Sequence, residues 1–163
     1  MSKTLKNLKE AFSGESQANR KYLAFAHKAD QEKMPYAARI FRAAAEAETI
    51  HAHAHLRAMK GIGSTEDNLK EAISGETFEF SEMYPPMIED AKAEGEKSAE
   101  RSMTLANEAE KVHAEMFKKA LADPAKEPPK VYLCMVCGHI AEDHAPETCP
   151  ICGSKGHVYQ EIE

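Results

Sequence analysis

The sequence predicts a mainly α-helical protein, in which a four-helix bundle is followed by a small β domain held together by a metal ion. Apolar residues recur at spacings of three and four along four segments of the first 122 residues. A short pattern occurs twice in that part, which indicates two similar helix pairs. Beyond residue 130 the helical pattern stops, and two C-x-x-C pairs follow.

The first two helical segments have recognisable ends. The first is expected from about Thr4 to Asp30, where the apolar periodicity stops. The second is expected to begin at Pro35, because proline suits the first turn of a helix. Gly61 suits its end.

The third and fourth segments also carry start and stop signals. Ser64 with Asp67 three residues later resembles a capping pair, so the third helix is expected from about residue 66 to 94. Pro85 and Pro86 should bend this helix. The fourth is expected from about residue 96 to 122, where an Asp-Pro pair closes it.

The chain is expected to contain two domains joined by a short spacer. Residues 1–124 form the bundle, the proline-rich stretch AKEPPK at 125–130 forms a semi-rigid linker, and residues 131–163 form the second domain. The last segment is too short to build a hydrophobic core unaided, so a bound metal is the expected source of its stability.

Composition excludes several classes of partner. The 163 residues are 42% apolar, which is enough for a buried core, and carry a net charge of −6. An acidic surface attracts neither nucleic acid nor an anionic membrane. No segment approaches the roughly 20 apolar residues that cross a bilayer, and the N-terminus lacks the apolar core of a signal peptide. We therefore expect a cytoplasmic protein.

The bundle contains an internal duplication. LKEAFSGES at 8–16 recurs as LKEAISGET at 69–77, with seven of nine positions identical, and EAETIHA at 46–52 recurs as EAEKVHA at 108–114. Two similar helix pairs are expected to pack with approximate two-fold symmetry, so that what one half contributes to the centre the other half matches.

Acids and imidazoles lie in the middle of otherwise small or apolar helix faces. Several buried carboxylates together are untenable without positive charge, which metal ions supply. One E-x-x-H motif on a helix is usually a solvated pair, but two copies in register, with glutamates on the remaining helices, form the di-iron or di-manganese carboxylate pattern. Mixed imidazole and carboxylate ligation suits iron or manganese better than zinc or calcium. The candidate catalytic and metal-binding residues are Glu15, Glu48, His51, Glu76, Glu79, Glu110 and His113.

Other polar residues of the bundle have weaker assignments. Tyr22 and Tyr84 are expected as core aromatics whose hydroxyls reach a ligand carboxylate. His55 lies on the same face as His51, and we interpret it as a core histidine or a donor to a ligand rather than a ligand. The residues expected to face solvent, or to support a ligand in the case of the acids, are His27, His53, Glu46, Glu82 and Glu108.

The four cysteines form one C-x2-C-x11-C-x2-C pattern, which predicts a tetrahedral four-thiolate site at Cys134, Cys137, Cys149 and Cys152. Zinc ribbons and rubredoxin-type iron centres share this spacing, so the spacing leaves the metal open. In isolation zinc is favoured, whereas beside a redox-capable di-metal site iron becomes the better interpretation. The remaining histidines of this domain are expected at its surface: His139, His144 and His157.

The sequence resembles the rubrerythrin family over nearly its whole length. The matching features are SGES, ISGETFEF, EMYP, the two E-x-x-H helices and the CMVCG and CPICG knuckles, in that order. The resemblance implies a ferritin-like four-helix bundle followed by a rubredoxin-like domain. It implies a di-iron site, oxo- or hydroxo-bridged when oxidised, held by the seven residues named above, and one iron held by the four cysteines. It also implies that Glu79 exchanges with His51 as one iron changes oxidation state.

The function implied by the resemblance is a non-haem di-iron peroxidase that reduces hydrogen peroxide to water in oxidative-stress defence. Electrons would pass through the cysteine-bound iron from rubredoxin or an NAD(P)H-dependent reductase. Because a short linker is not expected to bring that iron near the di-iron site within one chain, a head-to-tail homodimer is a further hypothesis, and whether its domains are swapped stays open. The alternatives are a ferritin-like protein that oxidises or stores iron, and an interaction module with a zinc ribbon.

Overall fold

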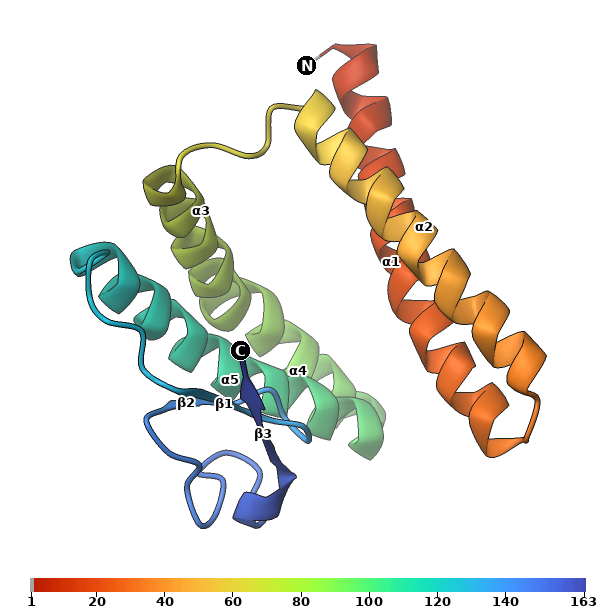
Figure 1. Cartoon of the computed structure of the whole chain (residues 1–163). Coiled ribbons are helices and arrows are strands. Elements are labelled where there is room, and N and C mark those ends of the chain that lie inside the picture. The colour runs from red at the N-terminus through yellow and green to blue at the C-terminus, as the bar shows by residue number, and fades with distance from the viewer. Residues whose placement is uncertain (1) are drawn as a thin grey trace. The chain divides into compact units, whose positions relative to one another are not determined.

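The computed structural model describes residues 2–163 and has the predicted mainly α architecture, with a small sheet at the C-terminal end (Figure 1). None of the helices in this range is long and apolar enough to cross a membrane. The elements are α1 (Lys3–Gln31), α2 (Pro35–Ala58), α3 (Thr65–Phe78), the π-helix η1 (Glu79–Met83), α4 (Tyr84–Glu94), α5 (Lys97–Ala122), β1 (Val131–Cys134), β2 (Ile140–Glu142), the 3-10 helix η2 (Gly156–Val158) and β3 (Tyr159–Ile162).

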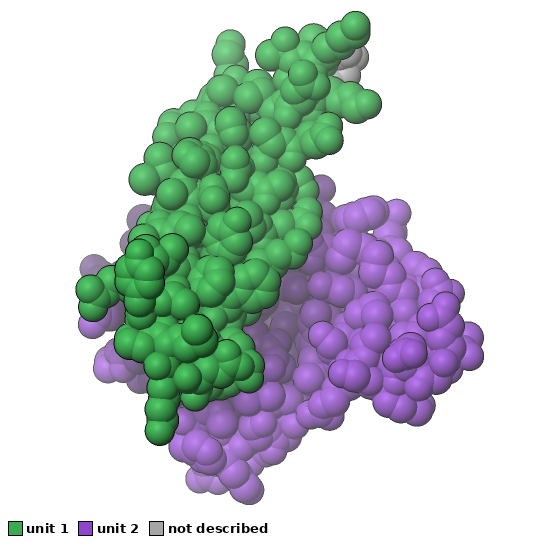
Figure 2. All heavy atoms as spheres, turned by 90° about the vertical axis from the view of Figure 1, so that its right-hand side faces the viewer, with its two compact units in different colours: residues 1–63 green, residues 64–163 purple. Residues whose placement is uncertain are grey.

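Contacts within the chain define two compact units, residues 1–63 and residues 64–163 (Figure 2). The first unit contains α1 and α2, and the second contains everything from α3 onward. The predicted domain boundaries at 124/125 and 130/131 stay a prediction.

The first unit is a helical hairpin in which α1 and α2 lie side by side. Small residues let the two helices approach closely, since Ala26 on α1 and Ala38 and Ala45 on α2 are almost fully buried. The buried Asn19 amide donates to the Ala45 carbonyl at 2.7 Å and to the Thr49 hydroxyl at 2.8 Å. This polar tie fixes the register of the two helices.

In the second unit α3, η1 and α4 form one continuous helical run that packs on α5. The predicted cap is present: the Ser64 hydroxyl accepts from the Asp67 N–H at 3.1 Å, and the Asp67 carboxylate accepts from the Ser64 N–H at 3.3 Å. The run ends at Gly95, whose φ of +76° suits glycine.

The irregularity expected at Pro85 and Pro86 begins earlier, as the π-helix η1. The prolines occupy the first turn of α4, where a missing N–H is tolerated. A proline ring also clashes with the carbonyl four residues before it, and a widened turn relieves that clash. The helix therefore widens within η1 instead of breaking.

The C-terminal sheet is antiparallel, with strand order β2-β1-β3. Cys134 at the end of β1 pairs with Tyr159 at the start of β3. Cys134 and Cys149 are each only 1% exposed, so this small domain is centred on its cysteines rather than on large apolar side chains.

Candidate metal centres

The first unit holds one cluster of potential ligands. Glu15 comes from α1, and Glu48 and His51 come from α2. His51 Nδ1 lies 3.0 Å from Glu48 Oε2 and 3.8 Å from Glu15 Oε1. One ligand atom from each residue lies within 4.8 Å of the others, so the three can hold one cation.

The second unit holds a matching cluster. Glu76 comes from α3, and Glu110 and His113 come from α5. His113 Nδ1 lies 2.6 Å from Glu110 Oε2 and 3.7 Å from Glu76 Oε2. The duplication predicted from sequence therefore appears as two geometrically similar groups, each with one imidazole nitrogen and carboxylates from two helices. Such mixed donors suit iron or manganese.

The second cluster is electrostatically strained without a cation. Burial, together with the hydrogen bond and negative charge of Glu110, raises the pKa of Glu76 to about 7. Two carboxyl groups that share a site cannot both ionise easily. A bound cation relieves both effects, so these residues fit the di-iron site that the sequence predicts.

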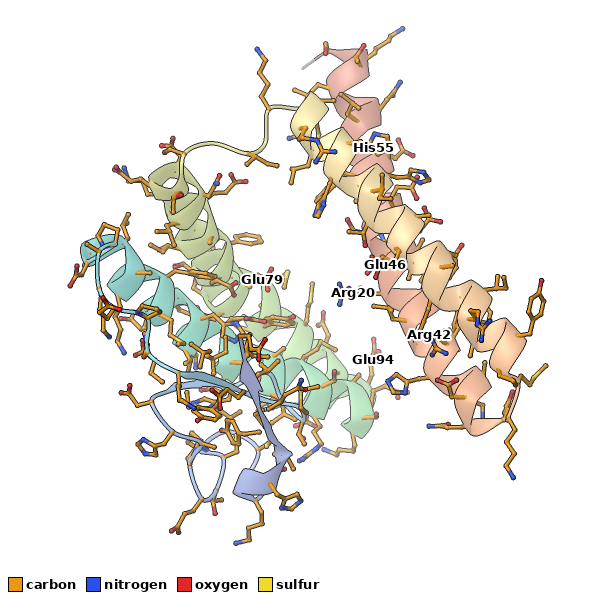
Figure 3. All side chains as sticks on the ribbon, in the orientation of Figure 1. Arg20, Arg42, Glu46, His55, Glu79 and Glu94 are labelled. Atoms are coloured by element: carbon orange, nitrogen blue, oxygen red, sulfur yellow. The ribbon has the colours of Figure 1, made fainter. Side chains whose placement is uncertain are left out.

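Glu79 and Tyr84 belong to the neighbourhood of the second cluster. Glu79, labelled in Figure 3, is the first residue of η1, and its pKa is raised by burial and by the charge of Glu76. Burial and the charges of Glu79, Glu110 and Glu76 raise the pKa of the Tyr84 hydroxyl. Both side chains therefore lie within the electrostatic influence of the carboxylates.

Tyr22 and His55 lie in the first unit. The Tyr22 ring packs on Phe25 and Phe41, with centroids 6.3 Å and 6.2 Å away. His55, labelled in Figure 3, is half-buried one turn beyond His51. Of the seven predicted ligands, six are thus gathered in two groups of three, and Glu79 stands next to Glu76.

The π-helix explains an irregularity in the internal repeat. Glu15 and Glu76 are 61 positions apart (76 − 15), whereas Tyr22 and Tyr84 are 62 apart (84 − 22). The second half therefore contains one additional residue between its glutamate and its tyrosine, where the α-helix widens into η1. This change of offset is the sequence signal from which the π-helix could have been found. π-helical turns frequently lie at functional sites.

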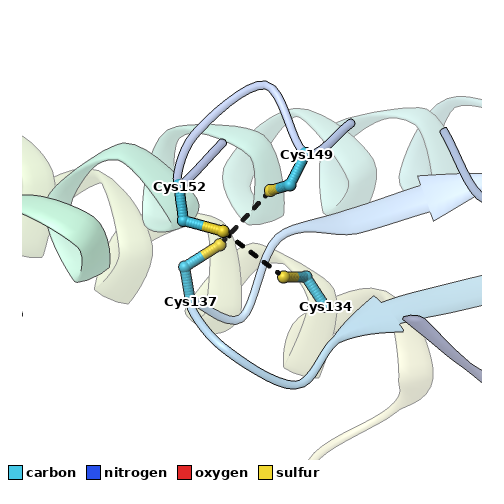
Figure 4. A group of neighbouring side chains, drawn as sticks. All are labelled: Cys134, Cys137, Cys149 and Cys152. Atoms are coloured by element: carbon cyan, nitrogen blue, oxygen red, sulfur yellow. Dashed lines mark hydrogen bonds between the residues drawn. The ribbon is translucent and has the colours of Figure 1, made fainter. Parts of the chain in front are cut away.

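The four cysteines form a compact sulfur cluster (Figure 4). Sγ of Cys134 lies 3.8 Å from that of Cys152, and Sγ of Cys137 lies 3.6 Å from that of Cys149. In a regular tetrahedron with metal–sulfur bonds of about 2.3 Å, neighbouring sulfurs are about 3.8 Å apart. The cluster therefore has the dimensions of a four-thiolate metal site.

Hydrogen bonds prepare part of this cluster for the thiolate state. Burial alone raises the pKa of the Cys149 thiol, but N–H groups of Cys152 and Ile151 and the Tyr159 hydroxyl together lower it to about 6. Burial raises the pKa of the Cys134 thiol. A metal ion supplies the positive charge that allows all four sulfurs to be thiolates together.

His139 was predicted at the surface, and this prediction is wrong. Its side chain is 8% exposed, and its Nδ1 lies 2.8 Å from the Tyr159 hydroxyl oxygen. The knuckle turn after Cys137 directs the chain back across the sheet, so the residue after Gly138 lies inside the domain. His144 and His157 are exposed, as expected.

The cysteine domain lies against α5 of the same chain. His113 Nε2 is 2.8 Å from the Gly138 carbonyl oxygen, and Lys119 Nζ is 3.0 Å from Glu142 Oε2. The expectation that the linker keeps the cysteine site away from the di-iron ligands within one chain is therefore wrong. The linker folds back along α5, and its length does not require a second copy.

Comparison with known proteins identifies the family of this chain. The family model described as rubrerythrin matches residues 6–121, and the model described as the rubredoxin-like domain of rubrerythrin matches residues 132–159. The chain belongs to the rubrerythrin family. Its two kinds of metal site, a di-iron carboxylate–histidine site and a four-cysteine site, are those of the family.

Relatives match over almost the full length. Rubrerythrin-2 of Clostridium acetobutylicum is 41% identical, over 94% of this chain and 93% of the relative. Nigerythrin of Nitratidesulfovibrio vulgaris is 38% identical, over 91% of this chain and 81% of the relative. A structure of nigerythrin in a partially reduced state superposes with a TM-score of 0.60 at 35% identity, covering 99% of this chain and 88% of that one.

Proposed function

We propose that this rubrerythrin-family protein is a peroxidase that reduces hydrogen peroxide to water, with electrons delivered through an iron ion at its four cysteines. The observation that supports this function is the bridging position of His113. Its Nδ1 faces Glu110 and Glu76, and its Nε2 contacts the carbonyl of Gly138 in the first cysteine knuckle. A storage protein has no need of such a connection to a second redox site.

The ligand assignment is part of the proposal. Carboxylates and imidazoles of both units hold two iron ions, and the sulfurs hold one. The di-iron ligands are Glu15, Glu48, His51, Glu76, Glu79, Glu110 and His113, and the cysteine ligands are Cys134, Cys137, Cys149 and Cys152. In this assignment residues 1–124 form the di-iron domain, 125–130 the linker and 131–163 the cysteine domain.

The chain's own groups prepare the site for this reaction. When bound, a ferrous pair supplies the two electrons that break the O–O bond of peroxide and yield water. The Nε2–H of His113 donates to the Gly138 carbonyl, which leaves Nδ1 unprotonated and aimed at the carboxylates. The Tyr84 hydroxyl, whose pKa is raised by burial and by the charges of Glu79, Glu110 and Glu76, keeps its proton and can donate a hydrogen bond to a carboxylate or to a departing oxygen.

The partners follow from the same proposal. The electron donor is a rubredoxin or an NAD(P)H-dependent reductase, and the protein acts in the cytoplasm. A head-to-tail homodimer, with or without domain swapping, is a separate proposal that the length of the linker does not require. Nigerythrin has been solved in mixed-valence, partially reduced and all-ferrous states. Several oxidation states of the iron in a relative support redox chemistry in this chain.

Stopped-flow mixing of the reduced protein with hydrogen peroxide and with oxygen tests the proposed substrate. We expect oxidation by peroxide to be much faster. A large preference for oxygen would instead favour ferritin-like iron oxidation and storage, and a colourless protein with stoichiometric zinc at the cysteines would exclude the electron relay.

The relay has a separate test in Cys149→Ser. We expect this variant to keep its di-iron absorption but to lose reductase-driven peroxide turnover, because one of the four thiolates is missing. The exposed neighbour Met135 provides the matched control, and Met135→Ala should turn over normally. Unchanged turnover in Cys149→Ser would refute the relay.

A further inference from the structure

A polar pair, the buried His139 and the half-buried Tyr159, lies beside the cysteine cluster and is not needed as a ligand. His139 and Tyr159 meet edge to face, with ring centroids 6.0 Å apart and planes at 88°. His139 Nδ1 is 2.8 Å from the Tyr159 oxygen, and the histidine is 8% exposed. Polar groups buried in so small a domain cost stability unless their hydrogen bonds are made, so their partners indicate what they do.

Tyr159 reaches a ligand sulfur from the sheet. It pairs across from Cys134 in the β1–β3 register, and its hydroxyl interacts with the Cys149 sulfur. The same hydroxyl therefore interacts with both His139 and Cys149. His139 also contacts the cluster through its backbone, because its carbonyl accepts from the Cys134 N–H at 2.8 Å.

The direction of these bonds follows from the number of protons. The tyrosine hydroxyl has a single proton, which it can give either to the sulfur or to the imidazole. A thiolate can only accept, and hydrogen bonds to a charged acceptor are roughly twice as strong as neutral ones. The favoured arrangement has His139 Nδ1–H donating to the Tyr159 oxygen and the Tyr159 O–H donating to Cys149 Sγ.

We propose that Tyr159 and His139 are positioning residues that raise the reduction potential of an iron ion held by the four cysteines. The inference rests on iron at this site, as in the proposed function. Ferric-to-ferrous reduction adds one electron and makes the four-thiolate site more negative by one charge. A hydroxyl that donates to Cys149 stabilises the more negative state, and hydrogen bonds to sulfur are among the known controls of iron–sulfur potentials.

Potentiometric titration of the iron-loaded protein, followed by its visible absorption, tests this inference. In Tyr159→Phe we expect the equilibrium constant for reduction to fall about tenfold, which is about 59 mV for a one-electron couple. His139→Phe should shift the potential in the same direction by less, because the hydroxyl stays but is no longer held. Tyr132→Phe is the matched control, since this half-buried tyrosine on β1 bonds to Glu161 instead, and it should leave the potential unchanged.

An unchanged or raised potential in Tyr159→Phe would overturn the inference.

A second measurement does not depend on the variant folding. In the cadmium-loaded wild-type protein, nuclear magnetic resonance should detect coupling between the Tyr159 hydroxyl proton and the metal through Cys149, and a hydroxyl proton coupled only to the His139 ring would refute the proposed direction. Neither readout uses peroxide turnover, so failure of the peroxidase proposal leaves both interpretable.

Discussion

Replacing Glu76 by glutamine should stabilise the metal-free protein at neutral and alkaline pH while weakening its affinity for metal. Glu76 is partly buried beside Glu110, and its pKa is raised from the ordinary 4.5 to about 7. The folded protein therefore holds this proton more tightly than the unfolded chain does. The stability that the proton provides is fully present below about pH 4.5 and is lost as the pH rises through about 7.

The size of this loss of stability follows from the two pKa values of Glu76. The difference between its ordinary pKa of 4.5 and its folded-state pKa of about 7 sets an upper bound of about 3.4 kcal/mol on the loss, because one pKa unit is worth about 1.4 kcal/mol. The Glu76 side chain is 23% exposed, so water screens part of the interaction, and we expect a loss of about 1–2 kcal/mol. Glutamine cannot ionise, so the variant should escape this loss.

Urea unfolding of chelator-treated protein at pH 5 and pH 8 measures the effect. Between the two values the wild type should lose about 1–2 kcal/mol more stability than Glu76→Gln. Glu71→Gln, an exposed site on the same helix, is the control and should behave like the wild type. Equal pH dependence in wild type and Glu76→Gln would refute the view that this carboxyl is strained without a cation.

Three further outcomes follow from the structure. Ser64→Ala should lower the free energy of unfolding by about 1 kcal/mol through loss of the helix cap, and an unchanged urea midpoint would contradict the capping role. Gly153→Ala should destabilise the cysteine domain by about 1 kcal/mol or more because φ is +73°, which thermal release of the bound metal would report. Removing the cysteine-bound metal should abolish the tertiary signals of residues 131–163 while far-ultraviolet circular dichroism still reports α1–α5; loss of both together would contradict independent stabilisation by the metal.

Much of this structure could be predicted because its signals are local. The cap at Ser64, the end at Gly95 and the two E-x-x-H motifs each depend on residues within one or two helical turns. Cysteine spacing likewise fixes the four-sulfur cluster, because each pair is held by its own turn. The expected ligand clusters follow from helical periodicity together with the internal duplication.

The features that could not be predicted depend on tertiary contacts. His139 is buried because the knuckle folds back toward Tyr159, 20 positions further on. The contact between His113 and Gly138 joins residues 25 positions apart, and it depends on the path of the linker. Neither of these separations along the sequence corresponds to a periodic pattern. The π-helix is intermediate, since the repeat offset records it but the prolines suggested a bend instead.

The extra residue within η1 has a geometric consequence for how such a protein can change. Each residue added to an ordinary α-helix turns everything after it by about 100° around the axis, which would move the Tyr84 side chain and all of α4 off the core. A widened turn absorbs the addition locally, so Ile88 and Ala91 remain buried. One half of a repeated fold can thus acquire an acidic side chain that the other half lacks, while the packing on both sides of the change is kept.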